Sequence, residues 1–376
     1  MKLKYIFRVA LFTLAIFLVS CGTVEEDTPL EIVETSSEVT EKINVVATTP
    51  MLGDFINEIG GDNINLVVLM PPEANPHTYD PSPQDAGKIS DADLIFYVGL
   101  KYEPAALIKL LENSSRGDEV LVEVGPNIDP IEFKEEGHDD HDEHEGHDDH
   151  DEHDEDKDHD EHEGHDDHDE HKGHEGLDHG SYAPHFWFDP IRVAMAAELI
   201  KDKLIDFDSG NKSEYESSGN AYINKLNDLD KSVSELIETV PSKNRKLITT
   251  HESLGYLENK YGIKILTTII PSLTTANEIT PSQLVDVIEL INDNDIKVIF
   301  VESEAPSVYS QTISEEANIN LVTGLWVETL KENQSYSEFF MSNVELIVEN
   351  LDHHDDHDDH DDHDYHEGHD DHEGEK

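Results

Sequence analysis

The chain has 376 residues, 86 of them acidic and 25 basic, and a formal net charge of −61 at pH 7. This length suffices for two α/β domains with separate cores. The negative charge argues against nucleic acid as a partner, because nucleic acid is bound by basic patches, but it can concentrate cations. The single cysteine, Cys21, excludes a disulfide framework and a zinc site made of thiolates.

Residues 1–20 are typical of a lipoprotein signal peptide. Basic residues at positions 2, 4 and 8 precede the apolar run 9–19, which is too short to span a bilayer. The run ends in the sequence LVSC (18–21), which resembles the lipobox cut by lipoprotein signal peptidase. We therefore expect an extracytoplasmic protein held to the membrane by lipid on Cys21. An ordinary cleaved signal peptide is the alternative.

Residues 21–41 are rich in Thr, Ser and Glu and are predicted to form a flexible tether. From residue 42 onward, short β-branched runs alternate with helical periodicity, which is the pattern of parallel strands covered by helices. We therefore predict an α/β fold with two Rossmann-like lobes, each a mainly parallel sheet with covering helices. The predicted ranges are 42–190 for the first lobe, 191–241 for the linking helices and 242–351 for the second lobe.

The linking region contains one long predicted helix, from residue 213 to about 240. Its apolar residues from Tyr222 to Val240 alternate in steps of four and three, which gives a single apolar stripe. A helix of this length would span roughly 42 Å at 1.5 Å per residue. We expect it to join the two lobes as a rigid brace.

Histidine is concentrated in two tracts. Of the 24 histidines, 13 lie in 138–179 and eight in the tail from residue 353, and the unit HEGHDDHDEH occurs twice in the first tract. The first tract has almost no apolar residue from 138 to 176, and we predict a disordered loop at 135–181 and a disordered tail at 352–376. Histidines and carboxylates so spaced favour weak, exchanging metal sites for capture, storage or sensing, although a solvated run without specific use is the alternative.

Three histidines remain outside the tracts: His77, His185 and His251. His77 lies in a proline-rich loop after the predicted strand 64–70, and ligands bind at such loops in parallel sheets. His185 is flanked by prolines, and His251 follows the predicted strand 246–250. Each histidine alone is weak evidence, but three in comparable contexts favour one metal site, because neutral imidazole is a ligand of Zn²⁺ and related ions. Glu328, beyond the last predicted strand, is the natural fourth ligand.

Three segments around these histidines resemble the ligand loops of one family, the ZnuA/TroA type of solute-binding proteins of ABC importers (metal-binding cluster A-I, family 9). They are 75–82 (NPHTYDPS), 184–190 (PHFWFDP) and 249–256 (TTHESLGY). Further matching motifs lie at 278–282, 301–304 and 325–328, and the resemblance extends over about 43–351. The histidine-rich insertion is similar to that of zinc-specific members, whereas the tail of His and Asp departs from the usual pattern.

The resemblance implies a site of these three histidines and a fourth ligand, which in the family is a carboxylate or water. We assign this ligand to Glu328, with Glu252 and Glu73 as alternatives. Manganese-type relatives commonly carry Glu where this chain has His251. Because exchange of oxygen for nitrogen shifts the preference toward Zn²⁺, we expect Zn²⁺ as the transported ligand and Mn²⁺ as the alternative.

The predicted function is that of a monomeric, non-enzymatic receptor that delivers zinc to an ABC permease driven by a separate ATPase subunit. A zinc hydrolase is the second class, since three histidines with an open position can activate water. However, the sequence has no G-x-S-x-G, H-E-x-x-H or P-loop pattern. A metal-sequestering surface adhesin is the third class, which the tracts alone would permit.

Overall fold

The computed structural model describes residues 42–133, 182–275, 279–294, 296–304 and 308–352. These residues belong to one unit that begins at Glu41 and is separate from Met1–Thr40. The predicted signal peptide, the tether, the loop 135–181 and the tail from residue 353 lie outside the described residues.

The first lobe is built on a parallel sheet with strand order β2-β1-β3-β4. Its elements are β1 (Ile43–Ala47), α1 (Pro50–Gly60), β2 (Ile64–Val68), α2 (Pro83–Asp91), β3 (Leu94–Tyr97), α3 (Ala105–Ser114) and β4 (Leu121–Glu123). Proline fits the first turn of α1, and the side chain of Thr49 caps it by accepting a hydrogen bond from the N–H of Leu52 at 3.2 Å. The loop that carries His77 follows β2, as predicted.

The second lobe repeats the alternation of strand and helix. Its elements are β5 (Lys246–His251), α6 (Gly255–Tyr261), β6 (Lys264–Ile270), α7 (Pro281–Asp293), β7 (Val298–Glu302), α8 (Val308–Ala317) and β8 (Asn320–Leu325). The strands pair in parallel as β5 with β6 and β7 with β8. Although β5 and β7 are in contact, the described residues show no backbone ladder between them. Instead, the hydroxyl of Thr250 accepts a hydrogen bond from the N–H of Glu302 at 3.1 Å.

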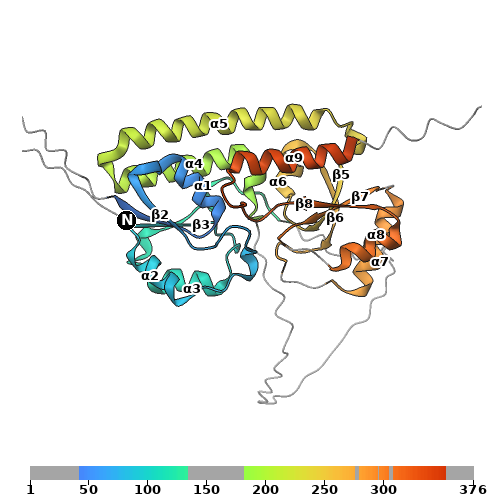
Figure 1. Ribbon diagram of the computed structural model, residues 1–376, viewed down its shortest axis with the longest axis horizontal. Helices are drawn as coiled ribbons and strands as arrows, with labels where there is room; N and C mark the ends of the chain where they lie inside the picture. The colour runs from blue at the N-terminus through green and yellow to red at the C-terminus, as the bar shows by residue number, and fades with distance from the viewer. Residues whose placement is uncertain (1–41, 134–181, 276–278, 295, 305–307, 353–376) are drawn as a thin grey trace, which may run out of the picture. The chain divides into compact units, whose positions relative to one another are not determined.

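Three helices bridge the lobes: α4 (Pro190–Phe207), α5 (Lys212–Glu238) and α9 (Tyr336–Asp352). Figure 1 shows α5 running along the same side as α4 and α9, and it contacts both of them as well as α1. With 27 residues, α5 is about 40 Å long at 1.5 Å per residue. Its buried stripe includes Tyr222, Leu226 and Val233, as the sequence pattern predicted. The predicted brace is therefore present.

One cluster of buried apolar side chains extends through both lobes, from Phe55 in α1 through Phe188 to Phe300 in β7 and Phe340 in α9. Two smaller clusters lie farther out, between the first sheet and α2 and α3, and between the second-lobe strands and α7 and α8. Separation of the lobes would expose the central cluster to water, at a free-energy cost of about 25 cal/mol per Å² of apolar surface. The continuous core therefore resists hinge opening between the lobes.

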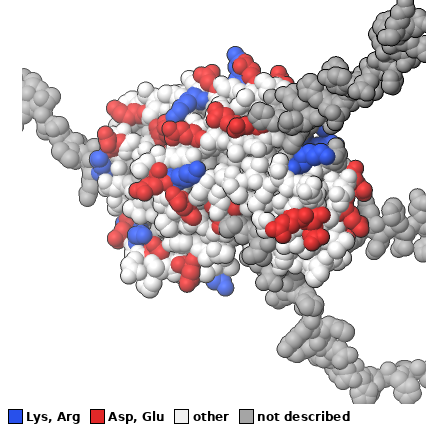
Figure 2. Space-filling view, turned by 45° about the vertical axis from the view of Figure 1, so that its right-hand side comes forward, with Lys and Arg blue, Asp and Glu red and all other residues white. Residues whose placement is uncertain are grey.

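The visible surface is acidic. Figure 2 shows patches of Asp and Glu over this face, with Lys and Arg scattered singly between them. Within the described part of the chain, no helix combines the length and the apolar character needed to cross a bilayer.

Candidate metal centre

His77 is placed by the short helical turn Pro76–Thr78, which follows the proline-rich stretch after β2. The side chain of Asn75 accepts a hydrogen bond from the N–H of His77 at 3.0 Å. The amide of the same Asn75 donates to the hydroxyl of Thr275 in the second lobe at 2.9 Å. The histidine loop is therefore fixed to both lobes.

His185 directly precedes the turn Phe186–Phe188, whose aromatic side chains are all buried. Within this turn, the indole N–H of Trp187 donates to the carbonyl oxygen of Val327 at 2.7 Å. The hydroxyl of Tyr336 in turn donates to the carbonyl oxygen of Trp187 at 2.7 Å. These bonds hold the segment that carries His185 against the segment that carries Glu328.

Glu328 lies just after β8 in a loop organised by a buried carboxylate. The backbone N–H groups of Val327, Glu328 and Thr329 all donate to Oε1 of Glu304, at 3.0, 3.0 and 3.3 Å. Three successive amides converge on one oxygen as they do in backbone nests, while burial raises the pKa of this carboxyl to about 8. Glu304 thereby fixes the backbone from which the side chain of Glu328 projects.

The four side chains predicted to bind metal lie together. The Nε2 atoms of His77, His185 and His251 are 3.0, 3.2 and 2.7 Å from one oxygen, Oε1 of Glu328. The possible ligand atoms all lie within 4.8 Å of one another. The side chain of His77 is 4% exposed, and those of the other two histidines are at most 1% exposed. The arrangement offers three nitrogens and one oxygen in a nearly dry site.

The orientation of His251 is set by a buried carboxylate. Its Nδ1 is 2.5 Å from Oε2 of Glu302. Because a carboxylate only accepts, Nδ1 carries a proton, and Nε2 is the nitrogen that faces the cluster. This Nε2 is buried without a hydrogen-bond partner, although it lies 2.7 Å from Oε1 of Glu328. Two lone pairs at this distance repel unless a proton or a metal ion lies between them.

The charges of the site are strongly coupled. Burial alone would lower the pKa of His251, but Glu302 and Glu328 outweigh it and raise that pKa to about 10. Burial dominates at His185 and lowers its pKa. For Glu328, burial opposes ionisation, but the neighbouring imidazoles, led by His77 and His185, hold its pKa well below the usual 4.5. The side chain of Glu328 is thus an ionised carboxylate.

The alternative fourth ligands lie elsewhere. In the described ranges, the one group of histidine, cysteine and carboxylate side chains that could hold a metal ion consists of the three histidines and Glu328. Glu252 accepts a hydrogen bond from the hydroxyl of Thr268 at 3.0 Å. Glu73 is exposed and has a positive φ of 64°. Neither carboxylate belongs to the cluster.

Sequence reasoning did not assign roles to three residues that hold the ligands: Tyr102, Glu302 and Glu304. The hydroxyl of Tyr102 donates to Oε2 of Glu328 at 3.0 Å. Both glutamates lie in segment 301–304, which had been singled out as a family motif. Their position at the carboxyl end of a strand was the available signal, but it did not show which atoms they would contact.

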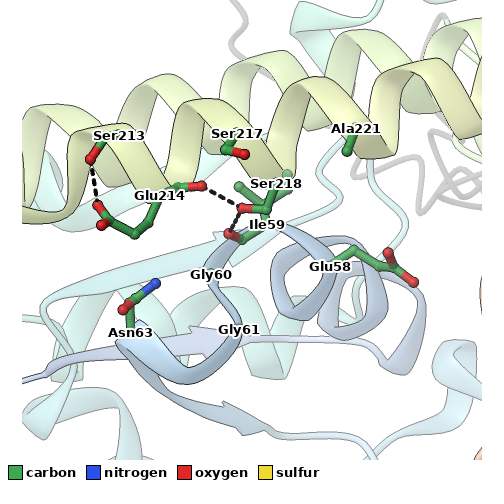
Figure 3. A pocket seen from close by; sticks show the side chains of 10 residues that line it. All are labelled: Glu58, Ile59, Gly60, Gly61, Asn63, Ser213, Glu214, Ser217, Ser218 and Ala221. Atoms are coloured by element: carbon green, nitrogen blue, oxygen red, sulfur yellow. Dashed lines mark hydrogen bonds between the residues drawn. The ribbon is translucent and has the colours of Figure 1, made fainter.

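Two hollows of similar size lie in the described surface, and only one is near the cluster. A cavity of about 500 Å³ is lined by His77, Tyr102, Pro184 and residues of both lobes, so it leads to the exposed edge of the site. A hollow of about 540 Å³ lies between the end of α1 and the first turns of α5, where Ser218 bonds to the carbonyl oxygen of Ile59 (Figure 3). It contains no histidine. Volume therefore does not identify the site, whereas ligand chemistry does.

Comparisons with known proteins identify the family of the chain. Residues 45–352 match the family model ZnuA, described as "Zinc-uptake complex component A periplasmic". The metal ABC transporter substrate-binding lipoprotein ScbA of Streptococcus cristatus is 29% identical, over 92% of this chain and 98% of its own length. The manganese-binding lipoprotein MntA of Halalkalibacterium halodurans is 25% identical, over 93% and 99%.

Solved structures show the same fold. The periplasmic zinc-binding protein TroA from Treponema pallidum matches with a TM-score of 0.65 and 21% identity, over 83% of this chain and 99% of that one. A manganese-bound periplasmic metal-binding protein from Candidatus Liberibacter asiaticus matches with a TM-score of 0.63 and 22% identity, over 82% and 100%. These relatives are named for binding a metal or for being the substrate-binding part of a metal ABC transporter. The chain belongs to the ZnuA family of substrate-binding proteins of metal ABC transporters.

Proposed function

We propose that this protein is a high-affinity extracytoplasmic receptor for Zn²⁺, with His77, His185, His251 and Glu328 as its ligands. The observation that carries the proposal is the convergence of three imidazole nitrogens on one carboxylate oxygen, at 2.7 to 3.2 Å. Zn²⁺ prefers four ligands in a tetrahedron and binds both nitrogen and carboxylate oxygen. A fourth protein ligand also closes the position that a zinc hydrolase would need for water.

Manganese is the second candidate, because several relatives are named as manganese-binding proteins. Mn²⁺ favours octahedral sites rich in oxygen. The cluster supplies one carboxylate and three nitrogens, so its donor set supports zinc. Mn²⁺ would gain a second oxygen ligand if both carboxylate oxygens of Glu328 bound it. One of them, Oε2, accepts a hydrogen bond from the hydroxyl of Tyr102, which disfavours this arrangement.

We further propose that the protein acts as a monomer anchored by lipid on Cys21 and passes its metal to the permease of the importer. Relatives are named as lipoproteins, and the sequence LVSC ending at Cys21 supports the same attachment here. A metal-sequestering adhesin would share the metal site but not the delivery step. Zinc uptake by cells that lack the protein separates these two roles.

The ligand assignment is tested by titration of the full chain with Zn²⁺ and with Mn²⁺ against a competing chelator that outcompetes weak sites. One tight Zn²⁺ site is expected, with Mn²⁺ bound more weakly. Replacement of His77, His185 or His251 by alanine is expected to abolish tight binding, because a four-ligand site has no spare ligand. Tight binding that persists in all three variants would contradict the proposal.

A further inference from the structure

We propose that Glu302 is a positioning residue that holds His251 in its metal-binding orientation and supplies the second negative charge that a divalent cation needs. This inference rests on the proposed function, because it concerns the same metal site. Glu302 does not belong to the four-residue cluster, and its hydrogen bonds to that cluster within the described residues are those to His251.

Glu302 is fixed at the end of β7 by contacts on every side. Its Oε2 is 2.5 Å from Nδ1 of His251, and its Oε1 accepts from the N–H of the same histidine at 3.2 Å. Oε1 also accepts from the hydroxyl of Ser253 at 3.2 Å, and the N–H of Glu302 donates to the hydroxyl of Thr250 at 3.1 Å. The residue is fully buried. Its carboxylate therefore has a single orientation.

This orientation determines what His251 can do. A carboxylate that accepts from Nδ1–H keeps that nitrogen protonated, so Nε2 is the nitrogen left to bind a metal ion. Oε1 of Glu328 lies 2.7 Å from this Nε2 without forming a hydrogen bond to it. Carboxylates placed behind a metal-binding imidazole in this way also increase its basicity. Glu302 thus makes His251 a pre-oriented and stronger ligand.

The other fully buried histidine lacks such support. Nδ1 of His185 has no hydrogen-bond partner among the described residues. The site is therefore asymmetric, with one imidazole held from behind by a buried carboxylate.

Charge balance gives Glu302 a second role. A divalent cation in a buried site needs nearby negative charge, because an uncompensated charge in a dry interior is costly. Glu328 contributes one negative charge directly. Glu302 contributes a second from behind His251, where it cannot itself reach the ion. The two carboxylates together match the charge of a divalent cation.

The test compares Glu302→Gln with Glu103→Gln in the full chain. Glu103 is a matched control because its buried carboxylate accepts from the hydroxyl of Thr48 and from the N–H groups of Val98 and Gly99, and contacts no proposed ligand. Affinity is measured with Zn²⁺ against a competing chelator. Co²⁺ absorption is the second readout, because a tetrahedral buried site absorbs much more intensely than weak, hydrated sites.

Glu302→Gln is expected to weaken the tight site about 10- to 100-fold, the usual effect of losing such a partner, and to shift the Co²⁺ spectrum. Glu302→Asp, which keeps the charge, is expected to recover part of the affinity. Glu103→Gln should leave both readouts unchanged. Wild-type affinity and spectrum in Glu302→Gln would overturn the inference, as would equal losses in Glu302→Gln and Glu103→Gln.

His251→Ala distinguishes failure of the inference from failure of the proposed function. If His251→Ala abolishes tight binding while Glu302→Gln retains it, only the role of Glu302 is wrong. If His251→Ala keeps the tight site, the metal centre itself is wrong, and the inference falls with it. Should Glu302→Gln fail to fold, Ser253→Ala removes one donor that orients the carboxylate. Weaker metal binding by that variant supports the inference, and unchanged binding overturns it.

Discussion

The hydroxyl of Tyr102 in the first lobe donates to both Oε2 and the carbonyl oxygen of Glu328 in the second, at 3.0 and 3.1 Å. Burial first and then the charge of Glu328 raise the pKa of Tyr102 well above 10, so the hydroxyl keeps its proton and remains a donor. The bond secures one carboxylate oxygen and leaves the other facing the histidines. Tyr102 therefore sets the direction of the fourth ligand.

We predict that Tyr102→Phe weakens Zn²⁺ binding about tenfold, since a hydrogen bond to a charged group contributes about 1.5 kcal/mol or more. The loss should exceed any change in Tyr97→Phe, because Tyr97 in β3 interacts with Glu123 and not with the cluster. Titration of both variants against the same chelator provides the measurement. Equal affinities of the two variants would show that Tyr102 does not orient Glu328.

A second prediction concerns protons released on metal binding. The pKa of His251 is raised to about 10 without metal, so this imidazole carries an extra proton at pH 8 that the metal must displace. His185, with its lowered pKa, is already neutral, and Glu328 is already ionised. Calorimetry at pH 8 in two buffers of different ionisation enthalpy should show release of about one proton per tightly bound ion. No release would indicate that Glu302 and Glu328 do not hold His251 in the charged form.

Because metal binding displaces a proton from His251, the affinity for Zn²⁺ depends on pH. Because the competing proton is bound below the raised pKa, apparent Zn²⁺ affinity should rise with pH, by about tenfold per unit for one displaced proton. An affinity that stays constant between pH 7 and 8 would contradict the assignment.

The sequence predicted the architecture because that architecture depends on local patterns. The stripe of α5 and the alternation of strands and helices are set by residues close together in the chain, and both are confirmed. Helix α6 was not predicted, since its seven residues are too few to show periodicity. The missing ladder between β5 and β7 was not predicted either, because side chains at the strand ends replace it.

The histidines of the site could be predicted from the sequence, whereas the residues that hold the site in place could not. His77, His185 and His251 stood out because all other histidines lie in the tracts. Tyr102 bonds to Glu328 across 226 residues of sequence, so that contact follows from the packing of the lobes and from no local pattern. The same holds for Glu302, which contacts His251 across 51 residues.

A third prediction concerns stability and pH at the junction of α1 and α9. Asp54 accepts from the N–H of Tyr336 at 3.0 Å, and burial raises its pKa from 3.8 to about 6. A carboxyl with a raised folded-state pKa contributes stability below its unfolded pKa and loses that contribution as pH rises through the folded value. Stability from Asp54 should therefore decline between pH 4 and pH 6.

Asp54→Asn keeps an acceptor for Tyr336 and removes the titration. At pH 7 it should raise the free energy of unfolding, on the order of 1 kcal/mol after discounting for partial exposure, and the gain should vanish near pH 4. Denaturant unfolding at both pH values tests this. Asp62→Asn, at an exposed carboxylate nearby, is the control. A gain that does not depend on pH would contradict the assigned cause.

A fourth prediction concerns the histidine-rich tract 138–179, which we expect to bind additional Zn²⁺ ions without contributing to the tight site. The bridge between Glu132 and Tyr182, and the bond from the N–H of Ala183 to the carbonyl oxygen of Ile131 at 3.0 Å, hold the two ends of the insertion together. Deletion of 138–179 leaves this junction in place. We expect the variant to bind fewer Zn²⁺ ions in metal analysis while retaining one tight site. Loss of the tight site on deletion would contradict this division of roles.

The central claim is that three imidazoles and Glu328 share one cation, and anomalous diffraction at the zinc edge tests it most directly. A crystal of the full chain with one equivalent of Zn²⁺ should show one strong peak in the cluster. That peak should lie about 2.0 to 2.1 Å from Nε2 of each histidine and about 2.0 to 2.2 Å from an oxygen of Glu328. A strong peak elsewhere, or one that lacks any of the three histidines, would contradict the account.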